Sequence, residues 1–320
     1  MSTDPDLAAA AETAVNQCLA LDPDEACVVV TDEERETIGE ALYAAALDVT
    51  DDVTMVRYPP GDTHGSEPPE PVAAAMAAGD VVFAPTTKSL SHTRARGRAN
   101  DAGARVATLP GITREVFTTG LDADYRTIAA HCADVHEQVA DADEIQVTSP
   151  GGTDLTVHVG DREWMIDDGI EHEPGGMTNL PAGEVFVSPT DANGTYVVDG
   201  TMRPHGLLEP DQQLRFDVRD GLVTEIDDPT IRETVETAAE AVGDAAYNLA
   251  ELGIGTNVAV TALVGSVLLD EKAAGTVHVA IGDDMGIGGD VDAPIHLDGI
   301  VRDASVTADG EPVSLPQPNR

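Results

Sequence analysis

Three side chains of the kinds that bind metal ions lie near the C-terminal end of the sequence. His278 lies in the apolar segment GTVHVAIGDD, and His296 and Asp298 follow in PIHLDGIV. Residues two positions apart on an extended strand point to the same side, so His296 and Asp298 are predicted to face one way. Imidazole and carboxylate groups are the usual ligands of zinc, iron and manganese. The three residues together therefore predict a metal site, although a lone buried histidine such as His278 is more often a hydrogen-bonded core residue than a ligand.

Two glutamates extend this candidate site. Glu184 opens the strand-like segment EVFVSP directly after a tight NLPAG connection, where loops place functional side chains. Glu251 follows a helix predicted over residues 229–250 and precedes GIGTN. A carboxylate at a helix C-terminus is unfavourable unless a cation lies nearby, which a metal ion would supply. In so acidic a chain, an ordinary surface carboxylate is the alternative for each glutamate.

Other motifs are less specific. The loop GDDMGIGGDVD (282–292) lacks the lysine and following helix of a phosphate-binding loop, which favours a flexible acidic loop. The segment TTKSLSHTRAR (86–96) holds Lys88 and His92 beside several arginines. These residues bind a substrate carboxylate or phosphate, or they simply pair with neighbouring acids. No HExxH motif occurs, and no GxGxxG follows an N-terminal strand, which excludes a zincin peptidase and a Rossmann dinucleotide site.

The order of predicted elements changes near residue 144. Before it, strands alternate with helices, which is typical of a mostly parallel sheet covered by helices. After it, short alternating strands follow one another with Gly, Asn or Asp turns between them, which indicates antiparallel pairing. We therefore expect an N-terminal α/β domain over 1–143 and a C-terminal α+β, metal-binding catalytic domain over 144–320. The strands predicted before the change are 26–30, 52–58, 80–85 and 104–110, and the helices are 5–20, 32–47, 67–78, 91–103 and 113–141.

Composition limits the environment and the partners. The 320 residues carry 59 acidic against 17 basic side chains, a formal charge of −42, and only two of the basic residues are lysine. Concentrated salt screens such repulsion, so the chain is predicted to be halophilic. With no basic stripe, no apolar run of membrane length and no signal peptide, we expect a cytoplasmic protein that binds neither nucleic acid nor membrane. Cys18, Cys27 and Cys132 form no metal spacing and are predicted to be reduced, buried thiols.

Several segments resemble those of a known family. NLPAGEVFVSP (179–189), AELGIGTN (250–257), DEKAAGTVHVAIGD (270–283) and IHLDGIV (295–301) are similar to peptidase family M29, the group of aminopeptidases T and S that includes leucyl aminopeptidases. The segment SLSHTRARGRANDAGARVATLPGIT (89–113) is also similar. The resemblance implies a homodimeric exopeptidase that holds two zinc or cobalt ions and removes N-terminal residues from small peptides. The ligands that it implies are Glu184, Glu251, His278, His296 and Asp298, and it gives Glu184 and Glu251 catalytic roles, with one of them bridging the ions.

A second group resembles the same segments, the iron-dependent 2,5-dihydroxypyridine dioxygenases. In that group a single Fe(II) ion would take His278, His296 and Asp298, the two-histidine, one-carboxylate set of non-haem oxygenases. The length of this chain is closer to that of the dioxygenases. M29 aminopeptidases carry a tyrosine shortly after the histidine that matches His278, where this chain has Met285, and this departure argues against peptidase activity. The presence of both glutamates favours two metals and the peptidase, which is the function we expect from the sequence. A non-catalytic member of the fold is the third alternative.

Overall fold

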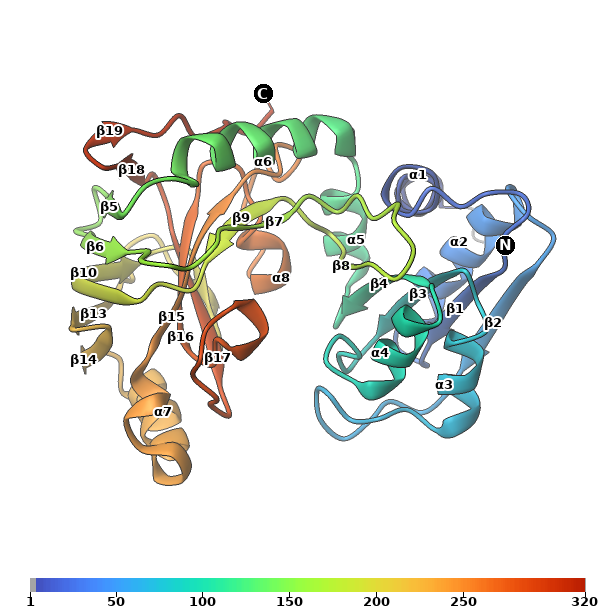
Figure 1. Cartoon of the computed structure of the whole chain (residues 1–320), viewed down its shortest axis with the longest axis horizontal. Coiled ribbons are helices and arrows are strands. Elements are labelled where there is room, and N and C mark those ends of the chain that lie inside the picture. The colour runs from blue at the N-terminus through green and yellow to red at the C-terminus, as the bar shows by residue number, and fades with distance from the viewer. Residues whose placement is uncertain (1–3, 320) are drawn as a thin grey trace. The chain divides into compact units, whose positions relative to one another are not determined.

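The computed structural model describes residues 4–319 (Figure 1). The chain divides into two compact units, and each is made of two separate segments. The first unit comprises Met1–Ala129 and Asp167–Ala182, and the second comprises Ala130–Ile166 and Gly183–Arg320. The sequence predicted a single boundary between residues 143 and 144. The division is instead discontinuous, because the chain returns to the first unit to add one short strand.

The first unit is built around a five-stranded sheet in the order β2-β1-β3-β4-β8. All four strand pairs are parallel, as the alternation of strands and helices predicted. The strand β8, which comes from the later half of the chain, is the exception to the predicted order. The strands are β1 (Cys27–Thr31), β2 (Val53–Arg57), β3 (Val81–Thr86), β4 (Arg105–Pro110) and β8 (Met177–Asn179), and the helices are α1 (Pro5–Thr13, continued by a π-helical turn over Ala14–Cys18), α2 (Glu36–Leu47), α3 (Glu70–Met76), α4 (Arg94–Asp101) and α5 (Arg114–Gly120).

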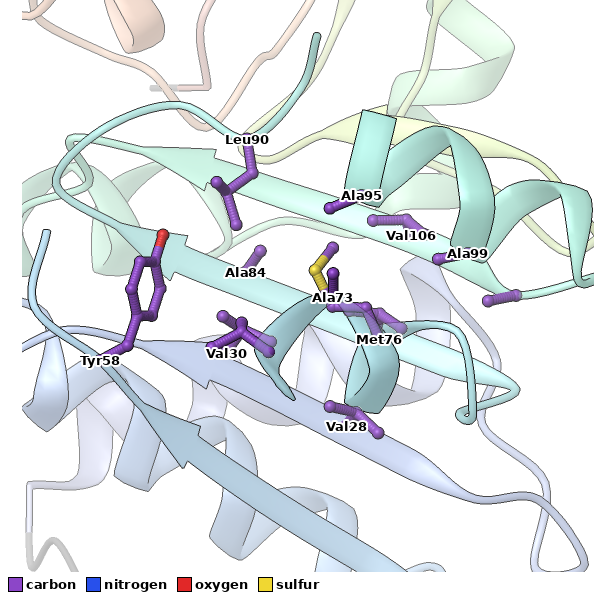
Figure 2. Packing of buried hydrophobic residues seen from close by; sticks show 13 residues of the cluster. Val28, Val30, Tyr58, Ala73, Met76, Ala84, Leu90, Ala95, Ala99 and Val106 are labelled. Atoms are coloured by element: carbon purple, nitrogen blue, oxygen red, sulfur yellow. The ribbon is translucent and has the colours of Figure 1, made fainter. Parts of the chain in front are cut away.

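One face of this sheet packs against α3 and α4. Figure 2 shows Val28 and Val30 of β1 beneath Met76 of α3, while Ala95 and Ala99 of α4 face the sheet. All of these side chains are buried. Because the alanine side chains are small, α4 lies close to the sheet. The arginines of α4 remain at the surface.

The second unit contains two seven-stranded sheets, in the orders β14-β13-β10-β6-β5-β18-β19 and β12-β11-β17-β16-β15-β9-β7. The strand pairs recorded in them are antiparallel, as predicted. The strands are β5 (Glu144–Thr148), β6 (Asp154–His158), β7 (Met165–Asp167), β9 (Glu184–Val187), β10 (Asp191–Val198), β11 (Thr201–Met202), β12 (Gly206–Leu207), β13 (Leu214–Arg219), β14 (Leu222–Ile226), β15 (Leu249–Gly255), β16 (Val277–Gly282), β17 (His296–Val301), β18 (Ser305–Ala308) and β19 (Glu311–Pro312). The helices are α6 (Tyr125–Val139, which begins in the first unit), α7 (Pro229–Val242) and α8 (Val267–Asp270), with 3-10 turns at Gly243–Tyr247 and Met285–Ile287.

The helix predicted over 229–250 is too long. It ends at Val242, where Gly243 adopts a φ of 65° that breaks the helix. The apolar residues after the turn form β15, which is buried along its whole length between β9 and β16. Glu251 therefore lies in the middle of a strand and does not oppose a helix dipole.

Two further expectations concern the cysteines and the membrane. All three cysteines are buried thiols, as predicted, and none of them forms a disulfide bond within residues 4–319. Within residues 4–319, no helix combines the length and the apolar character needed to cross a membrane.

Candidate metal centre

The five predicted ligands lie on four neighbouring strands of one sheet in the second unit. Glu184 begins β9, Glu251 lies on β15, His278 on β16, and His296 and Asp298 on β17. The register pairs Glu251 with Ala280 and Ala280 with Asp298, which places both acids in one row across the sheet. Directly paired residues, and residues two apart along a strand, share a face. All five ligand side chains therefore project from the same face of this sheet.

A glycine makes room for one of the histidines. Gly253 of β15 is paired with His278 of β16. A methyl group built at Gly253 would collide with the imidazole of His278, with Nε2 and Cε1 as its nearest atoms. The first glycine of the GIGTN segment is thus required because the imidazole lies directly over the backbone of the neighbouring strand.

The donor atoms form two sets of three. Glu184, Glu251 and His278 make the first donor group, and Glu251, His296 and Asp298 make the second donor group. Within each group the ligand atoms lie within 4.8 Å of one another. Glu251 belongs to both groups and turns one oxygen to each.

The distances show how Glu251 divides its two oxygens. Glu251 Oε1 lies 3.2 Å from His278 Nε2, and Glu251 Oε2 lies 3.2 Å from His296 Nε2. Asp298 Oδ1 is also 3.2 Å from His296 Nε2, and Glu184 Oε2 is 3.4 Å from His278 Nε2. Both histidines therefore present Nε2 to the carboxylates that would share a metal ion with them.

The hydrogen bonds of His296 and Glu184 leave donor atoms of both groups available to a metal ion. His296 Nδ1 lies 2.7 Å from the carbonyl oxygen of Asp283 and donates its hydrogen there, which leaves the Nε2 lone pair for a metal. Glu184 Oε2 is buried and accepts no hydrogen bond from residues 4–319. A buried carboxylate oxygen that accepts no hydrogen bond is costly, and a cation in the first donor group would satisfy it. The residues present thus fit divalent metal ions.

A buried lysine and a further glutamate border the first donor group. Lys272 Nζ lies 2.5 Å from Glu184 Oε1 and 2.6 Å from Glu271 Oε1. The lysine side chain is 4% exposed and the Glu271 side chain 14%. Sequence reasoning missed both residues, although Lys272 is one of only two lysines in the chain and lies six positions before His278.

The crowding of charges shifts the pKa values of these groups. Burial raises the pKa of Glu184, and the attraction of Lys272 opposes that rise. Burial also disfavours the Glu251 carboxylate, but hydrogen bonds from both histidines outweigh it and hold its pKa well below the usual range. Against the cost of burial, the carboxylates of Glu251 and Glu184 raise the pKa of His278 to about 9, and those of Asp298 and Glu251 raise the pKa of His296 to about 12. Both imidazoles are therefore protonated at neutral pH without metal, and metal binding must release those protons.

The remaining candidates have local partners. Arg94 pairs with Glu67, and Arg98 pairs with Glu70, so these arginines pair with neighbouring acids as the simpler interpretation of segment 86–96 predicted. In the loop after β16, Asp284 accepts hydrogen bonds from Ser188, Asn248 and the backbone of Val291. That loop is thus tied down at its base by a buried carboxylate.

Comparisons with known proteins identify the family and the fold. A family model named NicX, 2,5-dihydroxypyridine 5,6-dioxygenase, matches residues 6–315. Among solved structures, the 2,5-dihydroxypyridine dioxygenase of Pseudomonas putida KT2440 aligns with a TM-score of 0.80 and 18% identity, over 100% of this chain and 98% of that chain. AmpT of Thermus thermophilus aligns with a TM-score of 0.69 and 18% identity, over 98% of this chain and 100% of that chain. No curated protein matches.

Both groups that the sequence resembles are therefore found among the structural relatives, and the predicted fold class is confirmed. Together with the two donor groups, these findings describe a metalloenzyme of the fold shared by M29 aminopeptidases and dihydroxypyridine dioxygenases. Because the family model covers nearly the whole chain, this protein belongs to the 2,5-dihydroxypyridine 5,6-dioxygenase (NicX) family.

Proposed function

We propose that this protein is a metal-dependent aminopeptidase that holds two divalent ions, zinc or cobalt, and removes N-terminal residues from small peptides. The observation that carries the proposal is the position of Glu251, which belongs to both donor groups and turns one oxygen to each. A carboxylate placed in this way is suited to bridge two ions. Such a pair of ions supplies Lewis-acid polarisation of the scissile carbonyl and lowers the pKa of an attacking water.

The roles of the protein's own residues follow from their contacts. Glu251 belongs to both donor groups, and Glu184 offers the first group its Oε2, which accepts no hydrogen bond within residues 4–319. His296 is fixed in one tautomer by the carbonyl oxygen of Asp283, so its Nε2 stays directed at the second group. Within residues 4–319, no group of donors within 4.8 Å combines both histidines with Asp298, which is the set a single iron ion would need.

The test is to count metals and measure peptide cleavage in the same preparation. In concentrated KCl, protein loaded with zinc or cobalt should contain two ions per chain and cleave aminoacyl-arylamides. Glu251→Gln should lower activity by more than about 100-fold and reduce the number of bound ions, because it weakens both groups. Glu240→Gln, an exposed change on α7, is the matched control and should leave both measurements unchanged. Protein that holds two ions but cleaves no N-terminal residue from a broad peptide panel would refute the proposal.

A second function is favoured by the family model and by the higher TM-score of the Pseudomonas putida enzyme. In this alternative, a single Fe(II) ion binds His278, His296 and Asp298, and the protein cleaves a hydroxylated pyridine ring with oxygen. It predicts one iron per chain and oxygen uptake with 2,5-dihydroxypyridine. It also predicts that His296→Ala abolishes activity while Glu184→Gln has little effect, whereas the two-metal peptidase needs both residues.

A further inference from the structure

One of the two lysines of the chain is buried beside the first donor group. Lys272 Nζ makes short ion pairs with Glu184 Oε1 and Glu271 Oε1, at 2.5 Å and 2.6 Å. The chain has 59 acidic residues, and the side chain of this lysine is only 4% exposed among them. An ammonium group is a compact point charge with three donors, which suits a narrow space between carboxylates better than the planar fork of arginine.

The backbone around Lys272 fixes where the ammonium group can reach. The amide of Asn257 donates to the Lys272 carbonyl oxygen at 2.8 Å, and the Lys272 amide donates to the carbonyl oxygen of Leu269 at 3.0 Å. Gly255 of β15 lies against the same segment, and a methyl group there would collide with the backbone of Lys272 and Ala273. The second glycine of GIGTN thus allows the lysine segment to lie directly against a strand of the metal centre.

The two donor groups therefore differ in the cations that already neutralise them. In the second donor group the carboxylates face His296 Nε2, and an imidazole nitrogen can itself become a metal ligand. In the first donor group Glu184 faces an ammonium group, which has donors but no lone pair and cannot become a ligand. An ion entering the first group must share Glu184 with that positive charge.

We infer that Lys272 makes the two donor groups unequal: a divalent ion fills Glu251–His296–Asp298 first, and a second ion enters Glu184–Glu251–His278 only in competition with the lysine ammonium. The inference rests on the proposed function in one respect, that both groups take metal ions. It adds that Lys272 acts as an internal cation, which neutralises the first group whenever the second ion is absent. Metal supply then sets how many chains carry both ions.

The experiment is a calorimetric titration of Zn²⁺ into chelator-treated protein in concentrated KCl. The wild-type protein should show two binding steps whose affinities differ by roughly 10-fold or more, since like charges repel strongly in a buried site. Lys272→Met should raise the affinity of the weaker step by roughly 10- to 100-fold, so that the two steps merge. Lys272→Arg keeps the positive charge and should keep two steps. Lys88→Met removes the other lysine of the chain and should leave the titration unchanged.

A second variant controls for misfolding of Lys272→Met. Lys272→Met leaves Glu271 buried without its ammonium partner, which is costly. Lys272→Met combined with Glu271→Gln removes the ammonium together with one of its acids, and it should show the same merged titration. Circular dichroism checks that both variants remain folded.

The outcomes separate this inference from the proposed function. One ion in the wild type and two in Lys272→Met would support the inference and refute a two-metal peptidase. Two equal steps in the wild type, unchanged by Lys272→Met, would refute the inference and leave the peptidase intact. Loss of the weaker step in Lys272→Met with recovery in Lys272→Arg would also overturn the inference, because Lys272 would then serve to orient Glu184.

Discussion

Replacing Gly253 by alanine is predicted to disable half of the metal centre without unfolding the protein. The added methyl group would lie where the His278 imidazole now lies, against Nε2, Cε1 and Cδ2. The backbone of Gly253 is not in the left-handed region, so alanine is compatible with the strand itself. The ring must therefore move, because the methyl group is attached to a fixed, fully buried strand.

The size of the effect follows from the tolerance of metal ligands. His278 Nε2 now lies 3.2 Å from Glu251 Oε1, and useful ligand distances tolerate only about 0.2 Å of error. A shift of about 1 Å removes this ligand and should weaken the first donor group by more than about 100-fold. Overpacking of this kind costs about 1–3 kcal/mol, partly offset by about 0.4–1 kcal/mol from the stiffer unfolded chain. The net loss of stability thus lies between about 0 and 2.6 kcal/mol, too small to unfold the protein.

The assay combines metal analysis with unfolding. Gly253→Ala should bind one Zn²⁺ per chain instead of two, retain its circular dichroism spectrum and lose peptidase activity. Gly97→Ala is the matched control, because its methyl group on α4 would meet nothing within 4 Å, and it should be neutral or slightly stabilising. If Gly253→Ala binds two ions with wild-type affinity, the reasoning that places the His278 ring over Gly253 is wrong.

Three further predictions concern protons, metal and the loop after β16. Against the cost of burial, contacts with Glu251 and Glu184 raise the pKa of His278 from 6.5 to about 9. In the metal-free protein this group therefore adds about 3 kcal/mol to the free energy of unfolding below pH 6.5, and that contribution disappears as the pH rises through 9. Urea unfolding with a chelator at pH 6 and pH 9.5 measures the difference, and equal stabilities would contradict the assignment. Adding Zn²⁺ at about 100 times its Kd should stabilise the fold by about 2.7 kcal/mol. A melting temperature that changes with neither zinc nor chelator would therefore exclude a metal site. Asp284→Asn replaces a carboxylate that accepts three hydrogen bonds with an amide, and it should lower the free energy of unfolding by about 1–3 kcal/mol and speed hydrogen exchange over residues 285–295. Asp292→Asn, at an exposed position, is its control. Equal melting temperatures for the two variants would show that the buried carboxylate does not hold the loop.

The sequence predicted the fold class because its two regions have different periodicities. Strands alternating with helices indicated the parallel sheet, and consecutive short strands indicated the antiparallel sheets. The strand β8 could not be predicted from the sequence. Three residues are too few to show a periodicity, and the partner strand β4 is distant in the sequence.

The sequence predicted the five residues that the structure brings together, but not their geometry. His296 and Asp298 share a face because of their spacing, which sequence reveals directly. The location of Glu251 was wrong, since the apolar residues before it fit a helix as well as the strand they form between β9 and β16. Lys272 was missed because a lysine beside glutamate is usually a surface residue, and its burial is determined by strands distant in sequence.

The strand order of the metal-bearing sheet bears on how related proteins come to perform different reactions. The four strands that carry the ligands, β17, β16, β15 and β9, are consecutive and have further strands on both sides, β11 and β12 at one end and β7 at the other. Backbone pairing therefore holds the donor atoms in register while the connecting loops remain free to vary in length and composition. Mutations in those loops can then change the surroundings of the candidate ligands without disturbing the strands that carry them. The same fold is found in a 2,5-dihydroxypyridine dioxygenase and in AmpT, so it is shared by proteins of both groups that the sequence resembles.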